Sequence, residues 1–208
     1  MGKARSFLVP DLTPRDHREL KGVHFRYVFV AESPHVSEIS PERISERRPL
    51  CGTAGKVWWS ALSAILEGRE IEELSLVNLL GFCCRHRIAV MNAVSVPLDG
   101  GIIKHFKQAN PIRTLGFSKQ AGPRNYKRPS RARDRAVLDL RKRLLDPALQ
   151  EARIVALGND ADWFVRAALT QGERSAAGAC KIAHPSAWWR RGGHFGRISR
   201  EKLRQLLA

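Results

Sequence analysis

Two short segments far apart in the chain carry side chains that can hold or move protons. The first is Ala31-Glu32-Ser33-Pro34-His35, which follows the apolar run Tyr27 to Val30, and the second is His184-Pro185-Ser186, which follows Ala179 to Ala183. Each apolar run predicts a buried strand. Because ligands of an open α/β sheet bind beyond the carboxyl ends of its strands, we expect the two segments to face one site.

The chain is strongly basic, which indicates a polyanionic partner. Its 208 residues include 36 Lys and Arg against 20 Asp and Glu, for a net charge of +16 and a pI ≈ 10.7. Such an excess favours nucleic acid first and an anionic membrane surface second. No stretch approaches the roughly 18 apolar residues of a membrane span, and the charged N-terminus does not resemble a signal peptide. We therefore expect an intracellular, cytoplasmic protein that does not bind membranes.

Strands and helices alternate along the chain, which predicts an α/β fold. The expected architecture is a three-layer α/β/α sandwich around a mostly parallel four-stranded sheet. We expect one domain over residues 1–208, in which 1–22 form a surface lead-in, and 71–80 fit either a short helix or a strand. The predicted strands cover 24–31, 87–94, 152–157 and 180–183, and the predicted helices cover 54–67, 135–149, 161–169 (capped by Asn159 or Asp160) and 199–207 (capped by Ser199).

A long polar segment, residues 97–130, interrupts this alternation. Between Lys104 and Arg135 there are ten Lys and Arg and a single acid, with three aromatic residues among them. Basic residues with interleaved aromatic residues suit a surface that follows phosphates and stacks bases. We expect a DNA-binding loop that includes Lys127 and Arg128; the alternative is a solvated basic loop without a partner.

Five segments follow one another in an order known from one protein family. They are Glu32-Ser33-Pro34-His35 with Glu38, Arg48 to Gly55, Val90 to Val94, Ile154 to Gly158, and His184-Pro185-Ser186 with Arg190 to Gly196. Together they span residues 28–196 and resemble the motifs of the uracil-DNA glycosylase superfamily. The resemblance implies a flipped deoxyuridine whose N-glycosidic bond is hydrolysed, leaving an abasic site. No lysine in the matched motifs could form a Schiff base, so we expect no strand-cleaving step.

The resemblance assigns the chemistry to four polar residues. Glu32 is the first candidate for the carboxylate that positions water or stabilises the sugar cation, and Glu38 is the second. Typical members carry aspartate where Ser33 stands, so the group that handles the water stays open. His184 would donate a hydrogen bond to the base oxygen on which charge develops. The alternatives are loop carboxylates for both glutamates and a structural histidine beside a proline.

Further residues would select the base. Asn92 lies in an apolar strand, and its amide offers the donor and the acceptor that match O4 and N3–H of uracil and not cytosine. The alternatives are an Asn92 that binds backbone, and Asn78 in its place. His35 stands where relatives exclude the methyl group of thymine, and Leu50 stands where they stack a phenylalanine. Ser186 is expected to bind the neighbouring phosphate.

The resemblance also places a DNA wedge after His184. Relatives carry a leucine that enters the base stack at this point, and here Trp188 and Trp189 are the candidates, with Arg190 and Arg191 binding phosphates. The alternative is that the two tryptophans belong to the core.

We expect no metal and no cofactor. Relatives with the glutamate motif usually hold a four-cysteine iron–sulfur cluster, but here the first 50 residues contain no cysteine. The partner implied is uracil-containing DNA, bound by a monomer. The second candidate function is a protein that binds uracil or abasic sites with little catalysis, favoured by Ser33 and by the missing aromatic residue. A metal-dependent nuclease is disfavoured because the chain lacks clustered carboxylates.

Overall fold

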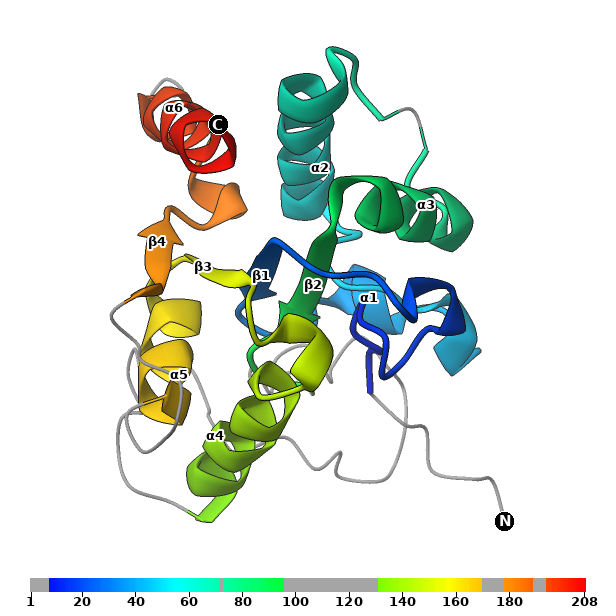
Figure 1. Cartoon of the computed structure of the whole chain (residues 1–208), viewed down its shortest axis with the longest axis vertical. Coiled ribbons are helices and arrows are strands. Elements are labelled where there is room, and N and C mark those ends of the chain that lie inside the picture. Colours follow the sequence, from blue (N-terminus) through cyan, green and yellow to red (C-terminus); the bar gives the residue numbers. More distant parts are fainter. Residues whose placement is uncertain (1–7, 72, 96–130, 170–177, 189–193) are drawn as a thin grey trace.

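Four parallel strands form the central sheet of the computed structural model (Figure 1). The structure describes residues 8–71, 73–95, 131–169, 178–188 and 194–208. The strand order is β2-β1-β3-β4. The strands are β1 (Tyr27–Ala31), β2 (Ile88–Asn92), β3 (Arg153–Leu157) and β4 (Cys180–Ile182). The prediction of a mostly parallel four-stranded sheet is confirmed.

Helices cover both faces of this sheet and complete three layers. Figure 1 shows α2, α3 and α6 on one side of the strands and α4 and α5 on the other. The ring of Phe29 in β1 meets Trp58 of α2 with 5.0 Å between centroids. The predicted α/β sandwich is therefore confirmed. The helices are α1 (Val36–Ile39), α2 (Thr53–Glu67), α3 (Leu76–His86), α4 (Arg131–Leu144), α5 (Asn159–Leu169) and α6 (His194–Leu207), with short 3-10 turns η1 (Arg18–Leu20), η2 (Ile44–Glu46), η6 (Pro147–Leu149) and η8 (Pro185–Ala187).

Several helix boundaries differ from those predicted. The ambiguous stretch 71–80 contains the start of α3, which is capped by Ser75 through a bond from the Asn78 backbone N–H to Oγ at 3.2 Å. Helix α6 begins at His194, and Ser199, predicted as its cap, is buried inside the helix. Helix α5 already includes Asn159. Local cap signals therefore placed these helices correctly but not their first residues.

The segment that precedes β1 belongs to the core. Val9, Leu12 and Leu20 are buried, and Leu12 makes an antiparallel bridge to Val90 of β2, with its N–H 2.8 Å from the Val90 carbonyl oxygen. The prediction of a surface lead-in over residues 1–22 is therefore wrong for the described part, which begins at Leu8. Prolines and charged residues separate the apolar residues of this segment, so that they show no helix or strand periodicity in the sequence.

The order in which strands are added to the sheet reverses beside β1, so that a switch point lies between β1 and β3. From β1 the chain crosses to β2 on one side, and later adds β3 and β4 on the other side. Ligands of such sheets bind at this switch point, beyond the carboxyl ends of the strands. Glu32 directly follows β1 and Gly158 directly follows β3. The fold thus puts these two residues on either side of the expected ligand position.

Candidate active site

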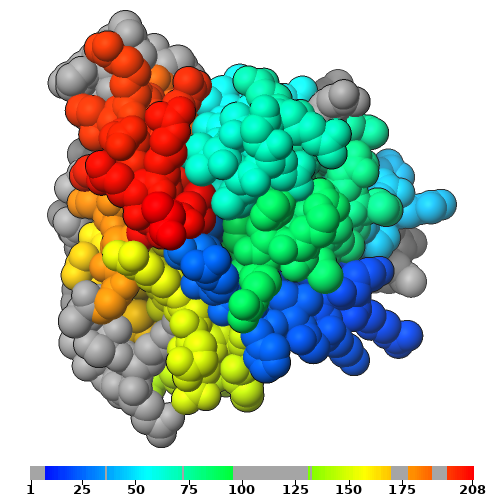
Figure 2. All heavy atoms as spheres, turned by 45° about the horizontal axis from the view of Figure 1, so that its top comes forward, coloured from blue at the N-terminus to red at the C-terminus, as the bar shows by residue number. Residues whose placement is uncertain are grey.

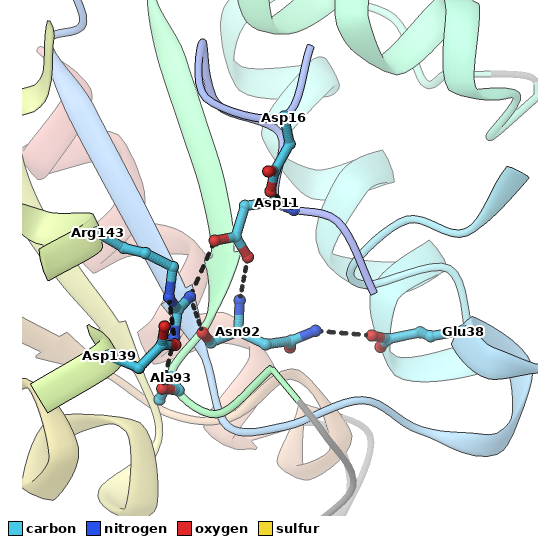
Figure 3. A network of polar contacts seen from close by, with 7 residues as sticks. All are labelled: Asp11, Asp16, Glu38, Asn92, Ala93, Asp139 and Arg143. Atoms are coloured by element: carbon cyan, nitrogen blue, oxygen red, sulfur yellow. Dashed lines mark hydrogen bonds and ion pairs between the residues drawn. The ribbon is translucent and has the colours of Figure 1, made fainter. Parts of the chain in front are cut away.

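A buried amide and a buried carboxyl group meet at the carboxyl end of β2 (Figure 3). Nδ2 of Asn92, which is 0% exposed, donates to Oε2 of Glu38 at 3.0 Å. Oε1 of Glu38 accepts the backbone N–H of Leu50 at 3.1 Å. Oδ1 of Asn92 has no hydrogen-bond partner among the described residues. Because an unpaired buried acceptor costs about 1–3 kcal/mol, Oδ1 is suited to a donor that a ligand brings.

These contacts give Glu38 a different role from the one predicted. Its side chain is buried, and both carboxyl oxygens accept N–H groups of the protein. Burial raises the pKa of this carboxyl to about 8, and the bonds from Asn92 and Leu50 only partly oppose the rise. A carboxyl group so enclosed does not fit the water-handling role for which Glu38 was the second candidate. It holds Asn92 instead.

The raised pKa of Glu38 predicts a stability that falls with pH. Because the folded pKa of about 8 lies above the ordinary 4.5, the folded protein keeps a proton that the unfolded chain has lost between these values. The free energy of unfolding should therefore fall as pH rises toward 8, by up to about 1.4 kcal/mol per pH unit from this group. Urea denaturation from about pH 6.5 to 8 measures the slope. Glu38→Gln should flatten it, and equal slopes in both proteins would contradict the assignment.

An ion pair holds the backbone of Asn92 (Figure 3). Nη1 of Arg143, on α4, donates to the Asp11 carboxylate at 2.9 Å and to the Asn92 carbonyl at 2.7 Å. Nη2 of Arg143 donates to the Ala93 carbonyl at 2.9 Å. Asp11 also accepts the backbone N–H of Asn92 at 3.3 Å. Both polar groups of the Asn92 backbone are thus fixed by one buried pair.

Two more carboxylates complete this network. Asp139, one turn before Arg143 on α4, accepts its Nε–H at 2.9 Å. Asp16 accepts the backbone N–H of Asp11 at 2.8 Å. Burial alone would lower the pKa of Arg143, but the adjacent carboxylates of Asp11 and Asp139 raise it above its ordinary value. The guanidinium group is therefore charged and bonded to carboxylate or carbonyl oxygens at all three of its nitrogens.

Arg143 and Asp11 were not predicted from the sequence. One signal was available for Arg143, because it falls on the same helix face as the buried Ala136, Leu140 and Leu144. An arginine at a core position of a helix requires buried partners. No local pattern marks Asp11, which lies 132 residues away in the chain.

Glu32 lies at the switch point, half-buried, directly after β1. Its carbonyl oxygen accepts the N–H of Val94 at 3.1 Å, so the segments that leave β1 and β2 run side by side. Strand β3 separates β1 from β4, which sets the ends of those two strands about 10 Å apart. Glu32 and His184 therefore follow strands on either side of β3. Ser33 is also half-buried.

The structure fixes His184 at one ring nitrogen. Nδ1 of His184 accepts the backbone N–H of Ser186 at 3.1 Å and lies 2.7 Å from Oγ of Ser186. Because a backbone N–H can only donate, Nδ1 is the acceptor and the neutral ring carries its proton on Nε2. The turn η8 thus presents His184 as a donor through Nε2–H. This is the protonation pattern that the predicted role requires.

Gly158 lies against His184 at the end of β3. It has φ +102, and a Cβ at this position would lie 2.8 Å from Cβ of His184. The N–H of Gly158 donates to the Ile182 carbonyl at 2.9 Å, which ties the turn after β3 to β4. A residue without a side chain is therefore needed for His184 to occupy its place.

Replacing Gly158 with alanine should lower the free energy of unfolding by about 1–3 kcal/mol, through backbone strain and collision with His184. Chemical denaturation measures the loss. Gly68→Ala is the control, since Gly68 also has a positive φ of +70 but open space around it. A loss at Gly158 no larger than that at Gly68 would show that the contact with His184 contributes nothing.

The loop that precedes α2 is strained at Leu50. This residue is buried and adopts φ 57, a left-handed conformation that costs about 1 kcal/mol or more outside glycine. Its N–H is bound by Glu38, and a Cβ at Gly55 would collide with its carbonyl oxygen. Glu38 is therefore anchored to a rigid loop.

His35, predicted to select the base, is exposed, with Nδ1 3.3 Å from Oγ of Ser37.

The structure corrects one DNA-contact assignment. Trp188 is 3% exposed, and its Nε1–H donates to the Ala183 carbonyl at 3.0 Å. The prediction that Trp188 enters the DNA stack is wrong for this structure, because the ring already packs in the core. The other predicted DNA contacts lie outside the described residues: Trp189, Arg190, Arg191, Lys127, Arg128 and the loop 97–130.

A groove lies between α2 and α6, apart from these residues. Figure 2 shows the two helices side by side on one face of the molecule. The groove has a volume of about 340 Å³, and Lys56, Arg200, Arg204 and Glu70 are its charged residues. None of the predicted catalytic or base-binding residues lines it. It is therefore not part of the candidate active site.

No protein-family model and no curated protein matches the chain. Across the described part of the chain, no helix is long and apolar enough to cross a membrane. Within the same residues, His, Cys, Asp and Glu side chains form no group of three or more that could hold a metal ion.

Proposed function

We propose that this protein is a uracil-DNA glycosylase that acts on DNA as a monomer and hydrolyses the N-glycosidic bond of deoxyuridine. The observation that carries the proposal is the edge presented by Asn92. Its Nδ2 is held by Glu38, whereas Oδ1 is buried and unpartnered among the described residues. Uracil brings a donor at N3 to such an acceptor, whereas cytosine brings a second acceptor and leaves Oδ1 unmatched.

Two further observations support the proposal. Asn92 ends β2, Glu32 directly follows β1 and His184 follows β4, so all three lie beyond or at the carboxyl ends of parallel strands. The neutral His184 ring has its proton on Nε2, as a donor toward a developing oxyanion must have. Motifs that are far apart in the sequence are thus gathered at one edge of the sheet.

The proposed reaction uses one water molecule and no cofactor. The bond between C1′ of the deoxyribose and N1 of uracil breaks, and its electron pair leaves with the base. His184 donates Nε2–H to O2 of the uracil anion. Glu32 stabilises the cationic sugar and takes a proton from the water whose oxygen bonds to C1′. The anion then takes a proton from solvent and Glu32 returns its proton to solvent, so that uracil and an abasic site are the products.

The experiment is incubation with a labelled oligonucleotide that holds a single uracil, in EDTA, followed by alkali. Strand breakage that requires alkali supports the glycosylase. Breakage without alkali, and only when metal is added, would overturn the proposal in favour of a nuclease.

Tight binding without breakage would instead support a protein that recognises uracil or abasic sites. The carboxylates of the segment 32–38 favour this second candidate. Ser33 stands where typical uracil-DNA glycosylases carry an aspartate, and Glu38 is buried, so Glu32 is the carboxylate of this segment that can reach water. A catalytic rate near zero with uracil-selective binding is the result that this candidate predicts.

A further inference from the structure

We propose that Glu38 is a positioning residue that fixes the orientation of the Asn92 side-chain amide and thereby decides which edge of a base the site accepts. An amide can turn over and exchange its oxygen and nitrogen at little cost unless a neighbour distinguishes them. The inference rests on the proposed function, because the base edge in question is that of the flipped nucleotide.

The backbone of Asn92 is held in place at both of its polar groups. Its N–H is bound by Asp11 and its carbonyl by Arg143, at 3.3 Å and 2.7 Å. The remaining choice is which end of the amide faces Glu38. The 3.0 Å contact between Nδ2 and Oε2 sets that choice. Oδ1 then becomes the atom offered to a ligand.

Glu38 can enforce this choice because its own carboxyl group cannot turn freely. Oε1 accepts the N–H of Leu50 at 3.1 Å, and a backbone N–H cannot be reversed. Leu50 is itself fixed in a left-handed conformation at φ 57. When the carboxyl group is ionised, above its pKa of about 8, the second oxygen, Oε2, is consequently held toward Asn92 as an acceptor. Burial of all three residues excludes water that could satisfy the wrong orientation.

Glu38→Gln tests this chain of contacts. Gln has one oxygen, which the Leu50 N–H requires, so its NH₂ group must face Asn92. The Asn92 amide should then turn over, so that Oδ1 accepts from Gln and Nδ2 faces the ligand. A donor in that place opposes the N3–H of uracil, whereas it can donate a hydrogen bond to N3 of cytosine. At a pH above 8, where wild-type Glu38 is ionised, we expect the ratio of uracil to cytosine excision to fall by about 10- to 100-fold.

Two controls separate orientation from general damage. Glu38→Asp keeps two acceptor oxygens and should retain more of the selectivity than Glu38→Gln. Ser63→Ala removes a partly buried bond on α2, from the Ile71 N–H to Oγ at 2.8 Å, which does not involve Glu38, Leu50 or Asn92. It should lower stability and leave the uracil-to-cytosine ratio unchanged. An unchanged ratio in an active Glu38→Gln protein would overturn the inference.

A second measurement decides the inference even if the protein excises nothing. The side-chain amide of Asn92 gives a nitrogen–proton NMR signal pair, identified as the pair that disappears in Asn92→Asp. In the wild type this pair should titrate with Glu38 at about pH 8 and should not titrate in Glu38→Gln. Identical spectra would overturn the positioning role. Absent excision together with the expected titration would overturn the glycosylase and leave the positioning role standing.

Discussion

Replacing Arg143 with methionine should lower the free energy of unfolding by about 3–5 kcal/mol at neutral pH. The guanidinium group is buried and bonded to two carboxylates and to the carbonyls of Asn92 and Ala93. Methionine fills much of the space but leaves Oδ2 of Asp11 and both carbonyls without the donor that Arg143 supplies. Equilibrium denaturation with urea measures the change. A loss below about 1 kcal/mol would contradict the structural role given to this network.

The matched control is Arg166→Met. Arg166 also bonds to an aspartate one turn earlier, with its Nε 3.0 Å from Oδ1 of Asp162, but its side chain is 52% exposed. An exposed pair of this kind contributes about 0.2–1 kcal/mol. The difference between the two variants therefore measures what burial and the further bonds of Arg143 to Asp11, Asn92 and Ala93 add to a pair with an aspartate one turn earlier.

The loss in Arg143→Met should also depend on pH. Burial raises the pKa of Asp11 to about 6, although Arg143 opposes the rise. Without Arg143 the carboxyl group takes up a proton more readily and avoids carrying an isolated buried charge. The two proteins should therefore differ less at about pH 5 than at about pH 8. A larger difference at low pH would contradict this account.

Replacing His184 with alanine should reduce uracil release by about 10²- to 10³-fold, the effect of removing one donor to a developing oxyanion. Substrate binding should change little, because the donor acts mainly in the transition state. Single-turnover kinetics and a salt titration of DNA binding measure the two effects separately.

The control for this variant is His24→Ala. His24 is exposed and precedes β1, at the edge of the sheet opposite to the site. Its removal should leave both turnover and binding unchanged. Full activity in His184→Ala would remove this histidine from the mechanism, whereas equal losses in turnover and binding would make it a binding residue.

The sheet and the position of Asn92 could be predicted from the sequence because both depend on local patterns. Strands β1 and β2 are buried at every position and appear as continuous apolar runs, as parallel strands covered on both faces do. Asn92 ends such an apolar run, and a polar amide at that place indicates a functional or buried hydrogen-bonded role. The carboxyl ends of parallel strands meet at one edge, so the motifs that follow β1 and β4 were also placed correctly relative to the sheet.

The partners of Asn92 could not be predicted, because they come from distant parts of the chain. Glu38 lies 54 residues away and Arg143 lies 51 residues away. Their roles depend on which side chains are buried together, and no local pattern encodes that. Composition was misleading at Trp188, where neighbouring arginines and glycines indicated a surface loop but the ring packs in the core.

The most direct test is detection of the free base. Duplex DNA with one labelled uracil, incubated with the purified protein in EDTA, should release uracil with a time course that follows enzyme concentration. His184→Ala purified in the same way should release it about 10²- to 10³-fold more slowly, which excludes a contaminating activity. Release of no uracil by the wild type, or of equal amounts by both proteins, would contradict the proposal that this site excises uracil.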